Sequence, residues 1–61
     1  MKYSELKRML KAAGCYKVSE GSNHEKWYSP ITGKTFTVGR HNGQDVKSGT
    51  ANGILKDAGL K

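Results

Sequence analysis

The 61-residue sequence predicts an α+β fold with the element order α-β-β-β-α. Two changes of hydrophobic period support this prediction. Near both ends of the chain, apolar residues recur every three or four positions, as on one face of an amphipathic helix. In the middle the period falls to two, and turn residues divide this stretch into three short strands of an antiparallel sheet. Because each helix has a single apolar stripe, we expect both helices on one face of the sheet and solvent on the other.

The first helix is predicted over residues 3–13. Its apolar side chains are spaced to form one buried face: Leu6, Met9, Leu10 and Ala13. Ser4 is placed to cap the start of this helix, and Gly14 to end it in a left-handed conformation. The basic side chains fall outside the apolar face: Lys7, Arg8 and Lys11. We therefore expect these cations to be solvated and available to a phosphate backbone.

Three short strands are predicted between the helices. The first follows directly on the first helix and ends at a polar turn, residues 20–23. The second covers residues 24–29, and the third covers residues 35–38 after a turn that contains Pro30 and Gly33. Strands that follow one another through such short turns pair in an antiparallel meander.

The second helix is predicted over residues 48–58, where Gly59 ends the pattern. Its apolar stripe is made of Thr50, Ala51, Ile54, Leu55 and Ala58. Gly53 lies inside this helix and costs about 1 kcal/mol relative to alanine. That cost weakens the helix prediction unless the glycine permits a close packing contact.

The charge balance favours a polyanionic partner. Eleven Lys and Arg against five Asp and Glu give a formal net charge of +6, so nucleic acid is the first candidate, although small proteins can also be basic for solubility alone. The chain is predicted to form one domain, residues 1–61. A domain of this size buries only about 60% of the surface that its unfolded chain exposes, which leaves no room for a deep enclosed site. Function must therefore be carried on an open surface.

The single cysteine, Cys15, excludes an internal disulfide and favours a reducing, cytoplasmic location. The N-terminal segment is charged and lacks the apolar core of a signal peptide, and no apolar run approaches the roughly 20 residues of a membrane span. No cofactor is indicated. A metal site is not expected either, because His24 and His41 are separated by a whole hairpin and show no recognisable ligand spacing.

The second strand carries the most informative group of residues. Alternation places three polar side chains on the same face: His24, Lys26 and Tyr28. Trp27 is the largest apolar residue available, so we expect it on the opposite face, packed with Phe36 and Val38 against the helices. A register shifted by one residue, with Tyr28 inward, is the alternative.

An outward row of histidine, lysine and tyrosine is suited to cleavage of RNA by its own 2′-hydroxyl. That reaction needs a base, a cation for the phosphate oxygens and a donor for the leaving oxygen. An imidazole, with an unperturbed pKa of about 6.5, can act as base or acid. Lys26 is the nearest candidate cation, and Tyr28 can stack on a base. With His24 as the one strong acid/base candidate we expect modest catalysis. The alternative for His24 is an ordinary exposed strand or turn residue.

Four segments resemble the HicA-type toxins of HicA/HicB toxin–antitoxin systems, small proteins that cut messenger RNA. The family's first helix is similar to MKYSELKRMLKAAG, and its Gly-Ser-x-His element matches GSNH. Its third strand and following loop resemble TFTVGRHNG, and its last helix resembles DVKSGTANGILKDAGL. The chain departs from the family at Gly39, Asn42 and Ser48, where members often have proline.

The resemblance implies a fold similar to a double-stranded RNA-binding domain and a metal-independent endoribonuclease that inhibits translation and growth. It implies that His24 is the single catalytic acid/base, with Gly21 and Ser22 as supporting motif positions. A HicB-type antitoxin is expected to cover the site of an otherwise monomeric toxin. Charge and position add further RNA-binding candidates: Lys17, Lys26, Tyr28, Arg40 and Lys47.

Two other functions remain open. A non-catalytic double-stranded RNA-binding module has the same element order and would bind duplex RNA without cutting it. A DNA-binding accessory that helps a partner repress its own promoter is less favoured, because neither short helix has a recognition face.

Overall fold

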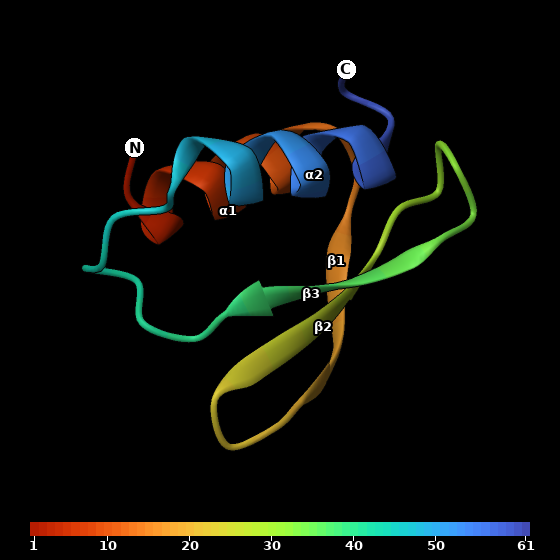
Figure 1. Cartoon of the computed structure of the whole chain (residues 1–61). Helices are drawn as coiled ribbons and strands as arrows, with labels where there is room; N and C mark the ends of the chain where they lie inside the picture. Colours follow the sequence, from red (N-terminus) through yellow and green to blue (C-terminus); the bar gives the residue numbers. More distant parts are fainter.

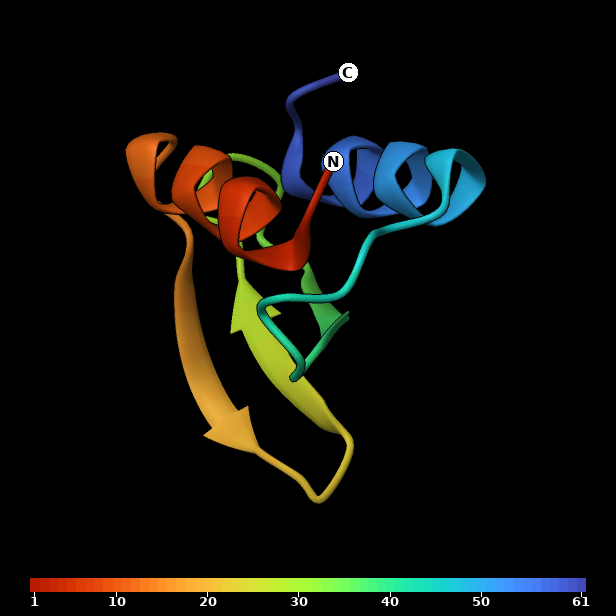
Figure 2. The same cartoon turned by 90° about the vertical axis from the view of Figure 1, so that its left-hand side faces the viewer.

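The computed structural model describes all residues, 1–61, and confirms the predicted element order. Helix α1 (Tyr3–Ala12) is followed by strands β1 (Tyr16–Glu20), β2 (His24–Tyr28) and β3 (Thr35–Gly39), and then by helix α2 (Ser48–Ala58). The two helices lie side by side on one face of the sheet, and the other face is uncovered (Figures 1 and 2). No helix is both long enough and apolar enough to cross a membrane.

The three strands form an antiparallel sheet in the order β1-β2-β3. In β2 and β3 the register is regular and pairs His24 with Gly39 and Trp27 with Phe36. Between β1 and β2 the register shifts at a bulge between Lys17 and Ser19. A bulge leaves one residue unpaired and reverses the alternation of the side chains beyond it. The side chains of β1 before and after the bulge therefore do not follow a single alternation between the two faces of the sheet.

The core confirms the inward orientation of Trp27. This side chain is 2% exposed and packs under the helices with Phe36 and Val38. The helices contribute most of the remaining core: Leu6, Leu10, Ala51, Ile54, Leu55 and Ala58. Cys15 is a free cysteine buried in the same cluster. On the opposite face of β2, His24 and Lys26 are exposed and Tyr28 is half-buried, as the alternation predicted.

Helix α1 starts at the predicted residue, but its N-cap differs from the prediction. The helix begins at Tyr3, its N-cap residue is Lys2, and no side chain caps it, so Ser4 lies inside the first turn. The loop after β3 replaces the missing cap. The backbone amides of Tyr3 and Ser4 donate to the carbonyls of Gln44 and Asn42, at 3.0 and 3.1 Å. These bonds satisfy amides that have no partner within the helix, and they attach the loop to α1.

The two helix ends behave as predicted at their glycines. Gly14 and Gly59 have φ values of +93° and +86°, in the left-handed region that glycine adopts without strain. At Gly53, where a close packing contact was one of two alternatives, a Cβ atom built on the backbone would meet nothing within 4 Å. This glycine therefore makes no close packing contact, and α2 has the bounds predicted for it, Ser48–Ala58.

Three side chains of the helices correct the predicted faces. Lys7 was expected in solvent, but it is buried at 7% exposure and forms an ion pair with Glu25. Met9 was expected in the core, but it is 39% exposed and lines a hollow with Ala51 and Leu55 of α2. Thr50 is also exposed, and it faces the end of the sheet that carries His24.

Candidate active site

His24 is held at the start of β2 by the turn that precedes it. The Gly21 amide donates to the His24 carbonyl at 2.7 Å, which closes the β1–β2 hairpin. A Cβ atom on Gly21 would lie 3.3 Å from that same carbonyl oxygen, closer than most side chains tolerate. The glycine of the GSNH segment therefore lets the chain turn tightly against the backbone of the histidine.

Arg40 fixes this turn from the other side. Its guanidinium donates to the carbonyls of Gly21 and Ser22, at 3.3 and 3.1 Å, and its backbone amide donates to the Asn23 carbonyl at 3.3 Å. The same guanidinium lies 3.7 Å from the Glu20 carboxylate. The structure therefore brings together Gly21, Ser22, His24 and Arg40, and Ser22 participates through its backbone carbonyl.

A cavity of about 310 Å³ opens beside His24, at the end of the sheet where β2 begins and β3 ends. The loop after β3 and the first turns of both helices complete its walls. Its polar lining is Tyr3, Asn23, His24, Thr37, Arg40, His41, Gln44 and Thr50. The cavity therefore contains both histidines of the chain. The structure contains no group of three or more His, Cys, Asp or Glu side chains that could hold a metal ion.

Tyr3 forms one wall of this cavity through a close contact with Gly39. A Cβ atom at position 39 would lie 2.7 Å from Cζ of the Tyr3 ring. Because Gly39 pairs with His24 across the strands, the tyrosine ring lies at the level of the histidine. Glycine is needed here because any side chain would displace the ring.

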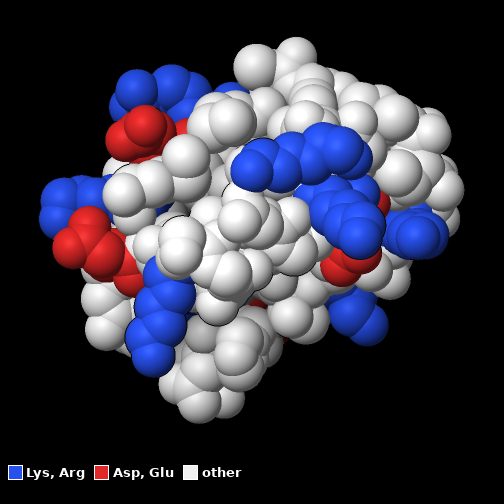
Figure 3. Space-filling view, turned by 45° about the horizontal axis from the view of Figure 1, so that its top comes forward, with Lys and Arg blue, Asp and Glu red and all other residues white.

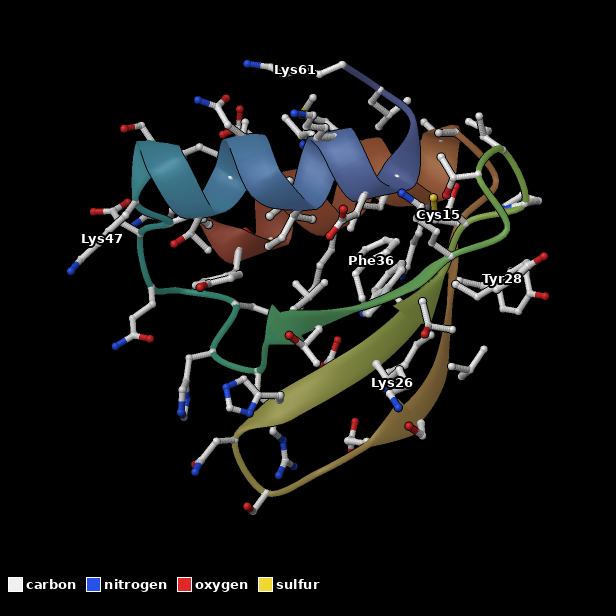
Figure 4. All side chains as sticks on the ribbon, turned by 45° about the vertical axis from the view of Figure 1, so that its right-hand side comes forward. Cys15, Lys26, Tyr28, Phe36, Lys47 and Lys61 are labelled. Carbon is white, nitrogen blue, oxygen red and sulfur yellow. The ribbon has the colours of Figure 1, made fainter.

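The uncovered face of the sheet continues from His24 along β2. A second, shallower hollow of about 200 Å³ includes His24, Lys26 and Thr37. Farther along, the rings of Tyr16 and Tyr28 pack with their centroids 5.5 Å apart, inclined at 49°. Figure 4 shows Phe36 between the helices and the sheet, with Lys26 and Tyr28 away from the helices. Lys26 and Tyr28 therefore share an open surface with His24.

The structure separates Lys17 from this surface. Its position opposite Trp27, next to the bulge, places it on the helix side of the sheet, where it lines a hollow with Lys7 and Lys11. Lys17 also pairs with Glu20 at 2.8 Å. The hydrogen bond to Glu20 and the charge of its carboxylate raise the pKa of Lys17. The same hydrogen bond, the Lys17 charge and the Arg40 charge lower the pKa of Glu20.

Lys47 also lies apart from His24. It is the residue immediately before α2 (Figure 4), and it lines neither hollow that contains the histidine. On the face seen in Figure 3, Lys and Arg side chains are spread out, with acidic groups between several of them. The net charge of +6 is therefore not gathered into one patch on this face.

A buried polar cluster anchors the loop that carries Arg40 and His41. Lys7 lies 3.1 Å from the Glu25 carboxylate and also donates to the Asn42 side chain. Glu25 accepts a hydrogen bond from the Trp27 indole at 3.0 Å. Burial alone would raise the pKa of Glu25, but the hydrogen bonds from Trp27 and Lys7, with the Lys7 charge, outweigh it and lower the pKa. The cluster joins α1, β2 and the loop.

Comparison with known proteins identifies the family. A sequence model of the family described as "HicA toxin of bacterial toxin-antitoxin" matches residues 3–60. The chain belongs to the HicA toxin family. It is 38% identical over 61 residues to "Probable mRNA interferase HicA 2" of Photorhabdus laumondii subsp. laumondii, with both chains covered completely. "Probable mRNA interferase HicA 1" of the same organism is 40% identical over 60 residues, 98% of this chain and all of the relative. No solved structure gives a significant match.

This HicA toxin holds its loop in place without the prolines expected from the resemblance. Gly39 accommodates the Tyr3 ring, and Asn42 contributes both its backbone carbonyl and its side chain to contacts with α1. Next along the loop, the Val46 amide donates to the Met1 carbonyl at 2.8 Å. Contacts with the N-terminal segment thus supply the order that proline would otherwise provide.

Tyr3 and His41 are the titratable residues of the HicA cavity that were not identified from the sequence as site residues. Tyr3 stands at the start of a helix, where an aromatic residue is usually part of the core. His41 lies in a polar loop, and its distance from His24 along the chain gave no sign of proximity. The strand register is the signal that brings them together, because Gly39 opposite His24 places His41 two residues beyond that pair.

Proposed function

We propose that this HicA toxin is a metal-independent endoribonuclease that cleaves messenger RNA, with His24 as its catalytic acid/base. The observation that carries the proposal is an exposed histidine at the wall of an open cavity that Arg40 also lines. Family membership and the two relatives, each named "Probable mRNA interferase", support the same substrate.

The proposed reaction is attack of the RNA 2′-hydroxyl on the neighbouring phosphorus. His24 exchanges protons with the reacting oxygens, because an imidazole is available in both protonation states near neutral pH. Lys26 and Arg40 each line a hollow that contains His24, and both can stabilise the charge that builds on the phosphate oxygens. These steps require only proton transfer and fixed positive charge. The shallow hollows suit an extended or loosely structured RNA.

We infer that RNA lies along the uncovered face of β2. Lys26 supplies a phosphate contact and Tyr28 a surface on which a base can stack. Lys47 and Lys17 remain candidates for more distant phosphate contacts, although Lys17 is on the helix side of the sheet and already paired with Glu20.

A HicB-type antitoxin is the proposed partner, bound so that it covers His24. The uncovered face offers the Lys26 charge beside the Tyr16 and Tyr28 rings, a combination that suits an acidic partner with an apolar centre. On this proposal the free toxin is a monomer that acts in the cytoplasm, and antitoxin and RNA compete for one surface. Protection of His24 from chemical modification on antitoxin binding is the expected result.

Cleavage of a labelled single-stranded RNA tests the function. His24→Ala is expected to abolish cleavage in the presence of EDTA and to relieve growth inhibition, with an unchanged urea unfolding curve. Lys56→Ala, on the outer side of α2, is the matched control and should cut normally. Undiminished cleavage by His24→Ala would overturn the assignment of His24.

The second candidate is a non-catalytic module that binds double-stranded RNA, favoured by the α-β-β-β-α order. In that case purified protein would bind duplex RNA with steep salt dependence and leave both strands intact. Cleavage that co-purifies with the wild-type chain and disappears in His24→Ala decides against this candidate.

A further inference from the structure

The geometry points to His41 as a second proton-transfer residue that works with His24 in the same cavity. This inference rests on the proposed endoribonuclease function and extends it. The sequence singled out one histidine, and nothing in its spacing linked the other to the site. The tertiary structure places both imidazoles in the lining of one hollow.

The reaction itself requires two proton transfers at different oxygens. One group removes the proton of the attacking 2′-hydroxyl, and another protonates the departing 5′-oxygen. The attacking and leaving oxygens of such a displacement lie roughly in line on opposite sides of phosphorus. One imidazole cannot contact both oxygens at once, so a site with a single histidine must leave one transfer to water or to another side chain.

The backbone around His41 is fixed relative to His24. Gly39 pairs with His24, and the Arg40 amide donates to the Asn23 carbonyl at 3.3 Å. The His41 carbonyl then accepts from the Gln44 amide at 3.1 Å, which closes a turn. Position 41 is therefore held by bonds immediately before and after it, and the two histidines face one cavity from adjoining elements.

The cavity that both histidines line has the size and lining for a phosphodiester group. Its volume, about 310 Å³, is at the lower end of the range for small-ligand pockets. The other charged or titratable groups that face it are Arg40, from the loop, and Tyr3, from α1. Arg40 cannot exchange protons in this range, and its Nη1 is occupied by two carbonyls. The histidines are therefore the pair suited to exchange protons near neutral pH.

In the proposed step, one histidine is neutral and the other is protonated. The neutral imidazole accepts the 2′-hydroxyl proton as the 2′-oxygen bonds to phosphorus and the bond from phosphorus to the 5′-oxygen breaks. The imidazolium gives its proton to that 5′-oxygen. The products are a 2′,3′-cyclic phosphate and a 5′-hydroxyl end, and the two histidines exchange protonation states.

A substrate with sulfur in place of the bridging 5′-oxygen separates the two roles, because a thiolate leaves without protonation. On ordinary RNA, His24→Ala and His41→Ala are each expected to lower kcat/KM at least 100-fold, the usual range for acid/base groups. On the sulfur substrate, only the variant that lacks the acid should recover, to within about tenfold of wild type. Recovery of both variants, or of neither, overturns the paired roles.

The pH dependence of kcat/KM gives a second readout, because loss of a residue with a purely structural role would not change the shape of this profile. Wild-type kcat/KM should be bell-shaped, with one limb for each histidine, and each variant should lose one limb. Gly43→Ala is the control for disturbance of the loop, since a Cβ there meets nothing within 4 Å. His41→Asn keeps a polar side chain should the alanine variant unfold. If His41→Ala cuts normally while His24→Ala is inactive, the second role is wrong and the proposed function stands.

Discussion

The Lys7 ammonium lies 3.1 Å from the Glu25 carboxylate in a nearly dry position, with side chains only 9% and 11% exposed. This pair connects the middle of α1 to the centre of the sheet. Through Asn42 and Trp27 it also joins the loop that carries Arg40 and His41 to the core. The position of the candidate site therefore depends on a polar contact inside the domain.

Removal of one partner of this pair should destabilise the fold strongly. Lys7→Met is expected to lower the free energy of unfolding by about 3 kcal/mol, because it leaves the Glu25 charge buried without its counterion. Urea denaturation followed by Trp27 fluorescence measures the change. Lys11→Met, exposed on the same helix, should shift the free energy by less than about 0.5 kcal/mol. Equal effects of the two variants would contradict a special role for the buried pair.

Protonation of Glu25 should lower the free energy of unfolding in acid. Folding lowers the pKa of this group below its ordinary value of 4.5, so the unfolded chain binds the proton more readily. The stabilisation of the fold by ionised Glu25 is therefore fully present above about pH 4.5, and it is lost as the pH falls through the pKa of Glu25 in the folded state. The stability difference between wild type and Glu25→Gln, measured by urea denaturation from pH 7 to pH 3, should narrow over this range. A difference that stays constant with pH would count against this linkage.

Gly39→Ala should disturb the wall of the cavity. The added methyl group would lie 2.7 Å from the Tyr3 ring, and such overpacking costs about 1–3 kcal/mol. Gly43→Ala is the matched control in the neighbouring loop, with an expected change below about 0.5 kcal/mol. In the Tyr3→Ala background the cost of Gly39→Ala should largely disappear. Additive effects of the two changes in thermal unfolding would show that the ring is not the obstacle.

Two glycines of the second helical region should respond to alanine with opposite signs. Gly53→Ala is expected to stabilise the protein by about 1 kcal/mol, because the helix interior has space for the methyl group. Gly59→Ala should destabilise it by more than about 1 kcal/mol, since φ is +86° and the methyl group would lie 2.6 Å from Ile31 Cγ2. Shifts of the same sign in Tm would contradict the described end of α2.

RNA affinity should depend on the uncovered face of β2. In the His24→Ala background, Lys26→Ala should weaken binding of single-stranded RNA and reduce the slope of log K against log salt by about 1. Tyr28→Ala should cost about 1–3 kcal/mol if one base stacks on the ring. Lys56→Ala, on the outer side of α2, serves as the charge-matched control in fluorescence anisotropy. A control that weakens binding as much as Lys26→Ala would place the RNA elsewhere.

Most of the secondary structure could be predicted from local patterns, because the hydrophobic periods of helices and strands depend only on residues close together in the sequence. The bounds of α2 and the inward side of Trp27 are examples. The predictions that failed depended on partners elsewhere in the chain. Lys7 stands at the margin of an apolar stripe, and only Glu25 on another element makes its burial favourable. The bulge in β1 moved Lys17 away from Lys26, because one unpaired residue reverses the alternation.

The sequence by itself determined the order of the elements, the exposed face of β2 and the position of His24 at the start of that strand, directly after a polar turn. Only the tertiary structure decided which groups surround that histidine. Arg40, His41 and Tyr3 reach it through strand pairing and through the contacts between the N-terminal segment and the loop after β3. Such contacts join residues far apart in the chain, and their geometry depends on the register of the sheet and the packing of the helices. Local periodicity does not contain that information.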